Sequence, residues 1–341
     1  MSLDTTQAAI GEQQATARPF PILFIANTYI GDVVLSSGLI RQLADKFPEA
    51  RFTIAVGPAA APLFADLPGL ERIIVVQKRR WRLHWLDLWT KVVARRWGLV
   101  VDMRGSTIVW LVSSRRRAAY HHDRGMGSTH KVVEIARALG LDRETPSPFL
   151  FTSPATDAAA RAYLGEGGPI LAIAPGANWV GKRWPAERFA AVAARLLDKN
   201  GALADGRLLV VGGPAERDAA QVIAAAVGPD RVIGAGPGEL DLLTTYACLK
   251  RARLFIGNDS GAMHLASAAG APALALFGPS DELRYGPWGQ NAMAVRGPRS
   301  RDEILRIDPG LNRSTCHMLD LSVDQVAQAA ADLITQSKAS A

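Results

Sequence analysis

The apolar residues of this chain fall into short runs that alternate with helix-like patterns. PILFIAN, residues 21–27, is typical of a buried strand. The four apolar residues that follow recur at every fourth position and so share one helix face: Leu35, Leu39, Leu43 and Phe47. The runs RFTIAVG, ERIIVV, GLVVDMRG and RRRAAYHHD predict four further strands. Strands that alternate with helices indicate parallel βα units.

The second half of the chain repeats this plan. PILAIAPG, GRLLVVGGP, DRVIG, ARLFIGN and APALALFGP predict strands. PAERFAAVAARLLDKNG predicts a helix, with Pro185 near its start and Gly201 past its end, and two more helices are expected over about 216–227 and at SVDQVAQAAADLITQ. The sequence therefore predicts two open α/β sheets in tandem, with ligand-binding loops at the carboxyl ends of the strands.

A stretch rich in Pro, Ala, Thr and Gly, about 153–168, separates the halves. We expect a loose tail at 1–18, an N-terminal Rossmann-like domain at 19–155 and a C-terminal one at 156–321. The last segment, 322–341, is expected to form a helix and tail, and it is a candidate to pack back on the N-terminal domain.

Composition narrows the classes of partner. The 341 residues include 39 basic and 32 acidic ones, a net charge of +7, which suits an anionic partner such as nucleic acid, a membrane surface or a phosphorylated ligand. Cys248 and Cys316 are the only cysteines, which favours a reducing compartment. No apolar stretch approaches the ~18 residues that span a bilayer, and the polar tail does not resemble a secretory signal.

The junction FIGNDSGAMHLASAAGAP, 255–272, carries the strongest candidate chemistry. A helix N-terminus leaves N–H groups unpaired; Gly261 lets a phosphate approach them, and Ser260 adds a donor. Asp259 precedes this pair, and His264 follows on the same side of the helix. The alternative is that Asp259 or Ser260 only caps the helix and His264 is a core residue.

Two other junctions of the second half suit a phosphorylated ligand. Lys182, in PGANWVGKRWPAERF, stands before a helix and could hold a diphosphate, although it could equally be a solvated residue. Trp184 beside it is interpreted as a packing residue. Glu216, in VVGGPAERD, could accept ribose hydroxyls, or it could simply be favoured by the helix dipole.

In the first half, Asp32 of TYIGDVVL begins a helix where it would face across an interdomain cleft. A carboxylate there could remove a proton from an attacking hydroxyl, and the alternative is an N-cap aspartate. GAGPG at 234–238 does not fit the dinucleotide pattern, and there is no Walker motif. His121, His122 and Asp123 lack metal-ligand spacing, so we expect no metal and no cofactor.

The segment 78–97, KRRWRLHWLDLWTKVVARRW, is basic and aromatic. Trp81, Trp85 and Trp89 would share one face of a helix, and that face would suit anionic head groups or would pack on the sheet. Candidate acceptor- or membrane-facing residues are Arg79, Arg80, Trp81 and Arg104.

Together these junctions resemble the ADP-heptose:lipopolysaccharide heptosyltransferases, glycosyltransferase family nine. The resemblance runs from about Ile22 to Val326 and is most specific in IGDVVLSSGLIRQL, PGANWVGKRWPAERF and GNDSGAMHLASAAGAPALALFGPSDELRYGPWG. It implies a GT-B architecture, in which two Rossmann-like domains face each other across a cleft, with the donor held by the C-terminal domain and the acceptor by the N-terminal one.

Residue by residue, the resemblance implies that Asp32 matches the family's proposed catalytic base and Lys182 its basic residue at the donor diphosphate. The donor-site signature is matched by Asp259, Ser260, Gly261 and His264, and Glu216 matches a ribose contact.

The resulting hypothesis is an inverting glycosyltransferase that moves a heptose from ADP-heptose to a lipopolysaccharide-core or related, lipid-linked glycan. We expect a cytoplasmic protein, peripheral on the inner face of the membrane, with no nucleic-acid partner. Two alternatives stay open: another nucleotide-sugar enzyme of this architecture, such as a UDP- or GDP-sugar transferase or an epimerase, and a non-catalytic nucleotide-sugar-binding protein.

Overall fold

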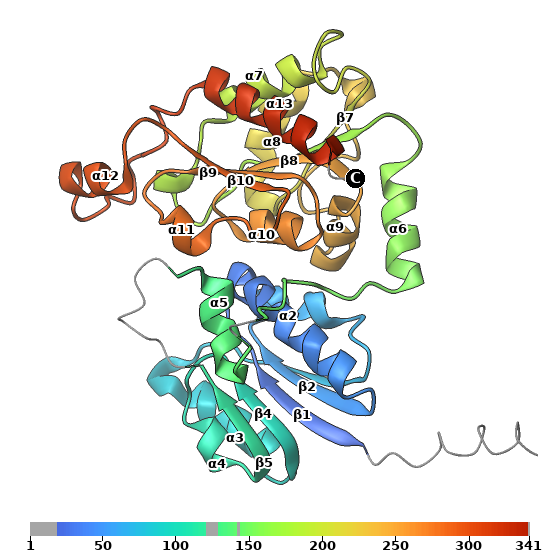
Figure 1. Ribbon diagram of the computed structural model, residues 1–341, viewed down its shortest axis with the longest axis vertical. Coiled ribbons are helices and arrows are strands. Elements are labelled where there is room, and N and C mark those ends of the chain that lie inside the picture. The colour runs from blue at the N-terminus through green and yellow to red at the C-terminus, as the bar shows by residue number, and fades with distance from the viewer. Residues whose placement is uncertain (1–18, 121–128, 142–143, 340–341) are drawn as a thin grey trace, which may run out of the picture.

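The computed structural model describes residues 19–120, 129–141 and 144–339, which form two α/β domains stacked on one another (Figure 1). The expected tail, 1–18, lies outside the described residues. Each domain is built on a five-stranded parallel sheet, and the α/β GT-B fold class predicted from the sequence is confirmed.

The N-terminal sheet has the strand order β3-β2-β1-β4-β5. Its strands are β1 Phe20–Ile25, β2 Ala50–Val56, β3 Leu70–Val75, β4 Trp97–Asp102 and β5 Ser114–Ala119. Its helices are α2 Ile30–Lys46, α3 Leu83–Val92, α4 Ile108–Leu111 and α5 Lys131–Ala136, with 3₁₀ turns at Pro58–Phe64, Arg80–Arg82 and Arg137–Leu139. All five strands predicted in this half are present.

The C-terminal sheet has the order β10-β9-β8-β6-β7. Its strands are β6 Ile170–Ala174, β7 Arg207–Val210, β8 Ala252–Asn258, β9 Ala273–Phe277 and β10 Ala292–Arg296. Its helices are α7 Ala186–Leu197, α8 Arg217–Ala225, α9 Leu242–Leu249, α10 Gly261–Ala268, α11 Glu282–Tyr285, α12 Arg301–Ile307 and α13 Val323–Ala339, with 3₁₀ turns at Val180–Lys182, Pro214–Glu216 and Pro229–Arg231.

Three expectations are corrected. The run DRVIG forms only an isolated parallel bridge between Leu208 and Val232, whereas β10, which was not predicted, extends the other edge of the sheet. Helix α13 packs on α7 and the C-terminal sheet, not on the N-terminal domain, because its apolar face completes that core. Trp81 does not share a face with Trp85 and Trp89, since it precedes α3 at φ 56° and is 86% exposed.

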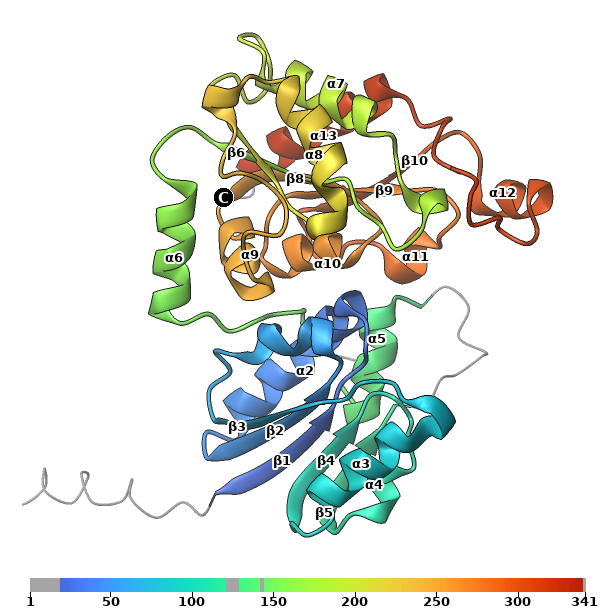
Figure 2. The ribbon, with the colours of Figure 1, turned by 180° about the vertical axis from the view of Figure 1, so that it is seen from behind.

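Helix α6, Pro154–Leu164, joins the two domains and runs beside the C-terminal one (Figures 1 and 2). The Ser153 side chain caps it by accepting the N–H of Thr156 at 3.2 Å. Asp66 of the N-terminal domain accepts the Ser153 N–H and the Thr156 hydroxyl, both at 2.6 Å. Lys250 of the C-terminal domain donates to Asp157 at 3.1 Å. The linker helix is therefore fastened to both domains.

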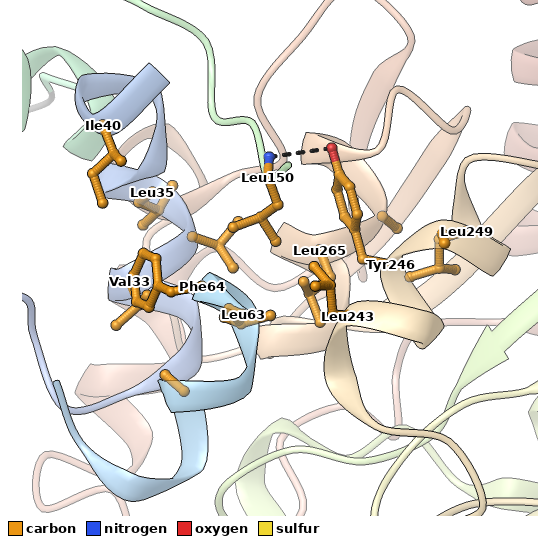
Figure 3. Close-up of a cluster of buried hydrophobic side chains, with 14 of the residues drawn as sticks. Val33, Leu35, Ile40, Leu63, Phe64, Leu150, Leu243, Tyr246, Leu249 and Leu265 are labelled. Carbon is orange, nitrogen blue, oxygen red and sulfur yellow. Dashed lines mark hydrogen bonds between the residues drawn. The ribbon is translucent and has the colours of Figure 1, made fainter. Parts of the chain in front are cut away.

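An apolar cluster continues from one domain into the other (Figure 3). Val33 and Phe64 come from the N-terminal domain, and Leu243 and Leu265 come from the C-terminal one. Leu150 of the linker lies between them, and its N–H donates to the Tyr246 hydroxyl at 3.3 Å. Burying a side chain of this size contributes about 1.5–3 kcal/mol, so this cluster stabilises one relative orientation of the domains.

Candidate active site

The N-termini of α2 and α10 meet where the two domains face each other. A Cβ atom added to Gly31 in α2 would lie 2.9 Å from Cδ2 of His264 in α10. One added to Gly261, the first residue of α10, would lie 3.0 Å from Cγ2 of Ile30. The two glycines therefore allow a backbone approach that larger residues would prevent. Both helix ends bring unpaired N–H groups and partial positive charge to this point.

Asp32 directly follows Gly31 in the first turn of α2. The N-cap position is taken by Tyr29, and no side chain caps this helix, so the N-cap alternative for Asp32 is not observed. Burial raises the pKa of the Asp32 carboxyl, and the nearby positive charge of Lys131 opposes that rise. A carboxylate whose pKa is raised is a better proton acceptor, and the lysine charge favours its ionised form.

Lys131 belongs to a buried polar cluster that sequence analysis missed. Its ammonium lies 3.3 Å from Glu134, and both residues hydrogen-bond the Tyr120 hydroxyl. Arg284 of α11 pairs with the second carboxylate oxygen of Glu134, which links the two domains. The spacing of Lys131 and Glu134 along one helix was the only local signal, because Arg284 is 150 residues away from Glu134 in sequence.

A second polar contact joins the domains beside that cluster. Nε2 of His130 lies 3.0 Å from the carbonyl oxygen of Gly286, and its ring lies 4.7 Å from the ring of Trp288. The Trp288 indole N–H donates to the Ser147 hydroxyl at 3.2 Å. The domains are thus held by apolar contacts at the linker and by polar contacts at α5.

Lys182 and Asp259 form an ion pair with 2.5 Å between Nζ and Oδ2, although they are 77 residues apart in sequence. The side chains are 22% and 8% exposed. An ammonium has three donors, so this pair leaves two of them for an anion. Lys182 is therefore not a solvated residue, and Asp259 is not the N-cap residue of α10, so neither alternative from the sequence is observed.

Asn258, for which the sequence suggested no role, fixes the loop that carries Lys182. Its side-chain oxygen accepts the N–H of Trp184 at 3.1 Å, and its amide donates to the carbonyl of Pro175 at 2.7 Å. Trp184 is 1% exposed and donates its indole N–H to Leu321 at 3.0 Å, as expected of a packing residue. The loop after β6 is therefore anchored to the end of β8.

Ser260 and His264 carry buried polar atoms without a partner. Among the described residues, nothing hydrogen-bonds the Ser260 Oγ or the His264 Nδ1. Ser260 is the N-cap residue of α10, but its side chain makes no capping bond. Burial lowers the pKa of His264 to about 4, against the opposing charge of Asp259, so the imidazole is neutral at pH 7. Because unpartnered buried polar atoms are costly, both side chains suit a polar ligand.

A cavity of about 510 Å³ extends from this point into the C-terminal domain. Val211, Leu240 and Leu242 line its apolar part, while Ser260 and Gly261 line its polar end. The N-terminal domain contributes Ile30. A small number of polar groups in a mostly apolar pocket is typical of sites for small organic ligands.

Glu216 lies at the edge of this cavity. Its Oε2 accepts the N–H of Gly213 at 2.8 Å, which satisfies the first-turn role that the alternative gave it. Its side chain also packs against Gly176, where an added Cβ would lie 2.7 Å from Cγ. Glu216 lines the cavity while it makes this local bond, so the local role and a ligand contact are compatible.

Two basic residues of the N-terminal domain lie over aromatic rings. Lys78 lies over the Tyr29 ring at 5.8 Å, and the Arg104 guanidinium lies over the Trp85 ring at 4.4 Å. Arg79 and Arg80 are exposed. The structure therefore brings Lys78 to the residue that precedes α2 and Arg104 to the aromatic segment, while Trp81 is exposed to solvent.

No group of three or more His, Cys, Asp or Glu residues that could hold a metal ion occurs in the described part of the chain. His121, His122 and Asp123 lie outside the described residues.

The two α/β domains, each built on a five-stranded parallel sheet, have the GT-B fold of glycosyltransferases. The sequence model of glycosyltransferase family 9 (heptosyltransferase) matches residues 76–307, and the chain belongs to this family.

Individual relatives of the family are similar to this chain in length and in fold. The chain is 22% identical to lipopolysaccharide heptosyltransferase 2 of Escherichia coli over 93% of this chain and 99% of that protein. The crystal structure of a family 9 glycosyl transferase from Veillonella parvula superposes with a TM-score of 0.75 at 22% identity, over 94% and 99% of the chains. The structure of E. coli ADP-heptose lps heptosyltransferase II gives 0.72 at 20% identity, over 94% and 100%.

Proposed function

We propose that this protein is an inverting heptosyltransferase that uses an ADP-activated heptose and a lipopolysaccharide-core or related glycan. The observation that carries the proposal is the contact between the starts of α2 and α10. It brings the first turn of α2, which contains Asp32, against the start of α10, with Ser260 and His264. The names of the family and of its E. coli relatives support the heptose and the adenine nucleotide.

The reaction would be a single displacement. The acceptor hydroxyl attacks the anomeric carbon, Asp32 accepts its proton, and the bond from that carbon to the diphosphate oxygen breaks. A positioned general base typically contributes about 10²–10⁴ in rate. Attack opposite the leaving group inverts the anomeric configuration.

The leaving nucleoside diphosphate gains negative charge as the bond breaks. Lys182, the Ser260 hydroxyl and the N–H groups at the start of α10 are the donors that would stabilise it. Asp259 would hold the Lys182 ammonium in place, and the neutral His264 would bond a sugar or phosphate oxygen without changing the charge of the site.

Calorimetry with ADP, UDP and GDP, followed by a transfer assay with ADP-heptose, tests the proposal. We expect ADP to bind most tightly and Asp32→Ala to keep nucleotide binding while losing transfer. Tighter binding of UDP or GDP would favour another nucleotide-sugar enzyme. Nucleotide binding without transfer to any core acceptor would favour a non-catalytic binding protein, and undiminished transfer by Asp32→Ala would rule out that residue as the base.

We also propose that the N-terminal domain, which would hold the acceptor, attaches peripherally to an anionic membrane. The segment after β3 exposes three large apolar side chains: Trp81 is 86% exposed, Leu83 50% and Leu86 57%. The arginines at 79, 80 and 82 beside them are exposed as well. Tryptophan with arginine suits the level of anionic head groups. None of the helices in the described residues is both long and apolar enough to cross a membrane.

Co-sedimentation with phosphatidylglycerol vesicles tests this attachment, with phosphatidylcholine vesicles for comparison. The triple variant Trp81→Ala, Leu83→Ser, Leu86→Ser should release the protein. The control Ile307→Ser, which removes a 70% exposed residue from α12 in the other domain, should not. Equal sedimentation of the triple variant and the unmodified protein would discard the attachment site.

A further inference from the structure

The loop from Gly234 to Leu240 forms one wall of the nucleotide cavity. Gly238 and Leu240 line that cavity, and the loop then leads into α9. The N–H of Gly238 donates to the carbonyl of Gly212 at 3.1 Å, and a Cβ on Gly238 would lie 3.2 Å from Cγ of Pro214. The loop therefore packs against the turn that also carries Glu216.

This loop has little conformational preference of its own. Gly234, Gly236 and Gly238 have φ angles of +68°, +120° and +90°. Glycine reaches such angles at no steric cost but loses more backbone freedom on ordering than any other residue. Contacts from outside the backbone are needed to keep the wall in one shape.

One carboxylate oxygen supplies those contacts. Oε2 of Glu239 accepts the N–H of Ala235 at 2.9 Å and the hydroxyl of Tyr163 at 2.7 Å. The first bond closes the loop on itself, and the second ties it to α6. The hydrogen bond from Tyr163, followed by that from Ala235, lowers the pKa of Glu239, so the carboxylate stays ionised at neutral pH.

The helix that provides Tyr163 is itself fixed at its other end. The hydrogen bonds from Ser153 and Thr156 to Asp66 attach the start of α6 to the N-terminal domain. Tyr163 lies in the last turn of α6. Its hydroxyl lies so close to Gly234 that a Cβ atom on that residue would overlap it. Arg207 donates to the carbonyls of Leu164 at 2.5 Å and Gly165 at 3.2 Å, so the anchor for the loop is a helix held at both ends.

We propose that Glu239 is a positioning residue for nucleotide binding, which, together with Tyr163 of the linker helix, holds the 234–240 loop as a preformed wall of the cavity. The inference rests on the proposed nucleotide-sugar function. Glu239 does not line the cavity, so it acts through the loop. Ordering the loop before binding removes an entropy cost that the ligand would otherwise meet.

The test measures ADP affinity by calorimetry and donor KM and kcat by transfer assay. We expect Glu239→Ala to weaken ADP binding and raise donor KM by about tenfold, equivalent to ~1.4 kcal/mol, while kcat changes less than about twofold, as for lost ground-state binding. Glu239→Gln retains an oxygen that can accept both bonds and should lose less, and Tyr163→Phe removes one of the bonds and should lose about threefold.

Glu303→Ala is the matched control, because Glu303 also accepts local hydrogen bonds, from the N–H and hydroxyl of Ser300, but lies in α12 away from the cavity. It should lower the unfolding temperature without changing ADP affinity. Unchanged ADP affinity in Glu239→Ala, or a fall in kcat at constant KM, would overturn the inference alone. Unmodified protein that binds none of ADP, UDP and GDP would overturn both the inference and the proposed function.

Discussion

Gly31 and His264 come from different domains, and a Cβ atom on Gly31 would lie 2.9 Å from Cδ2 of the His264 ring. Real Cβ atoms do not approach so closely, so a side chain at residue 31 would displace either the imidazole or a whole domain. The shape of the proposed site therefore depends on the absence of one methyl group in the first turn of α2.

Gly31→Ala is expected to separate activity from stability. The methyl group would move His264 and the start of α10, and a shift of this kind should lower kcat/KM by about tenfold or more. Alanine in place of glycine in a helix favours folding by about 0.5–1 kcal/mol, which offsets part of the packing strain. Steady-state kinetics and thermal unfolding of the same sample provide the check. Full activity would show that the two helix ends separate during catalysis.

Asp32→Asn should lose turnover but gain stability at pH 7. Because burial raises the folded-state pKa of Asp32 above its unfolded value, the folded protein binds more protons between the two pKa values, and stability falls as pH rises through that window. The neutral amide does not incur that loss. Urea unfolding at pH 7 measures the gain, and equal or lower stability of the variant would contradict it.

The charge of Lys131 should set the acid limb of the pH profile. The limb reflects ionisation of Asp32, so activity rises as pH rises through its pKa. Lys131→Met removes a positive charge that lowers this pKa and should move the limb to higher pH. Lys131→Arg, the control that keeps the charge, should leave the limb nearly in place. The measurement is kcat/KM from pH 4 to 9.

Ser260→Ala should change ligand affinity and stability in opposite directions. The Oγ of Ser260 is buried and has no partner among the described residues, so removing it relieves a desolvation penalty of about 1–3 kcal/mol. The same hydroxyl would donate to the diphosphate, so ADP affinity should fall by about fivefold or more. Calorimetry and thermal unfolding test both signs. A parallel loss of both would mean that the hydroxyl has a structural partner.

The ion pair between Glu134 and Arg284 should contribute to holding the domains together. The Glu134 side chain is 2% exposed, and it keeps Lys131 and the Tyr120 hydroxyl as partners when Arg284 is removed. Arg284→Met and Glu134→Gln should therefore each destabilise the protein by about 1–3 kcal/mol, less than a buried charge left wholly unpaired would cost. A double-mutant cycle by urea unfolding measures the coupling, and a coupling near zero would show that this contact does not hold the domains together.

The local pattern of the sequence was sufficient for most elements. Leu35, Leu39 and Leu43 recur with the helix period and are buried in α2, and every strand expected in the first half is present. The failures occurred where local pattern and tertiary packing disagree. The run AMAVR is only partly buried as edge strand β10, and Trp81 precedes α3 in a left-handed conformation that periodicity could not reveal.

The sequence by itself determined the strand-to-helix junctions and the residue types at them, because strand and helix periods and the positions of Gly, Pro, Asp and Ser are properties of short segments. The tertiary structure alone decided which junctions meet: Gly31 with His264, Lys182 with Asp259, and Glu134 with Arg284. These pairs are separated by 77 residues or more, as for Lys182 and Asp259. The first and third contacts depend on how the two domains pack, and the second depends on the pairing of β6 with β8 in one sheet, neither of which a single segment encodes.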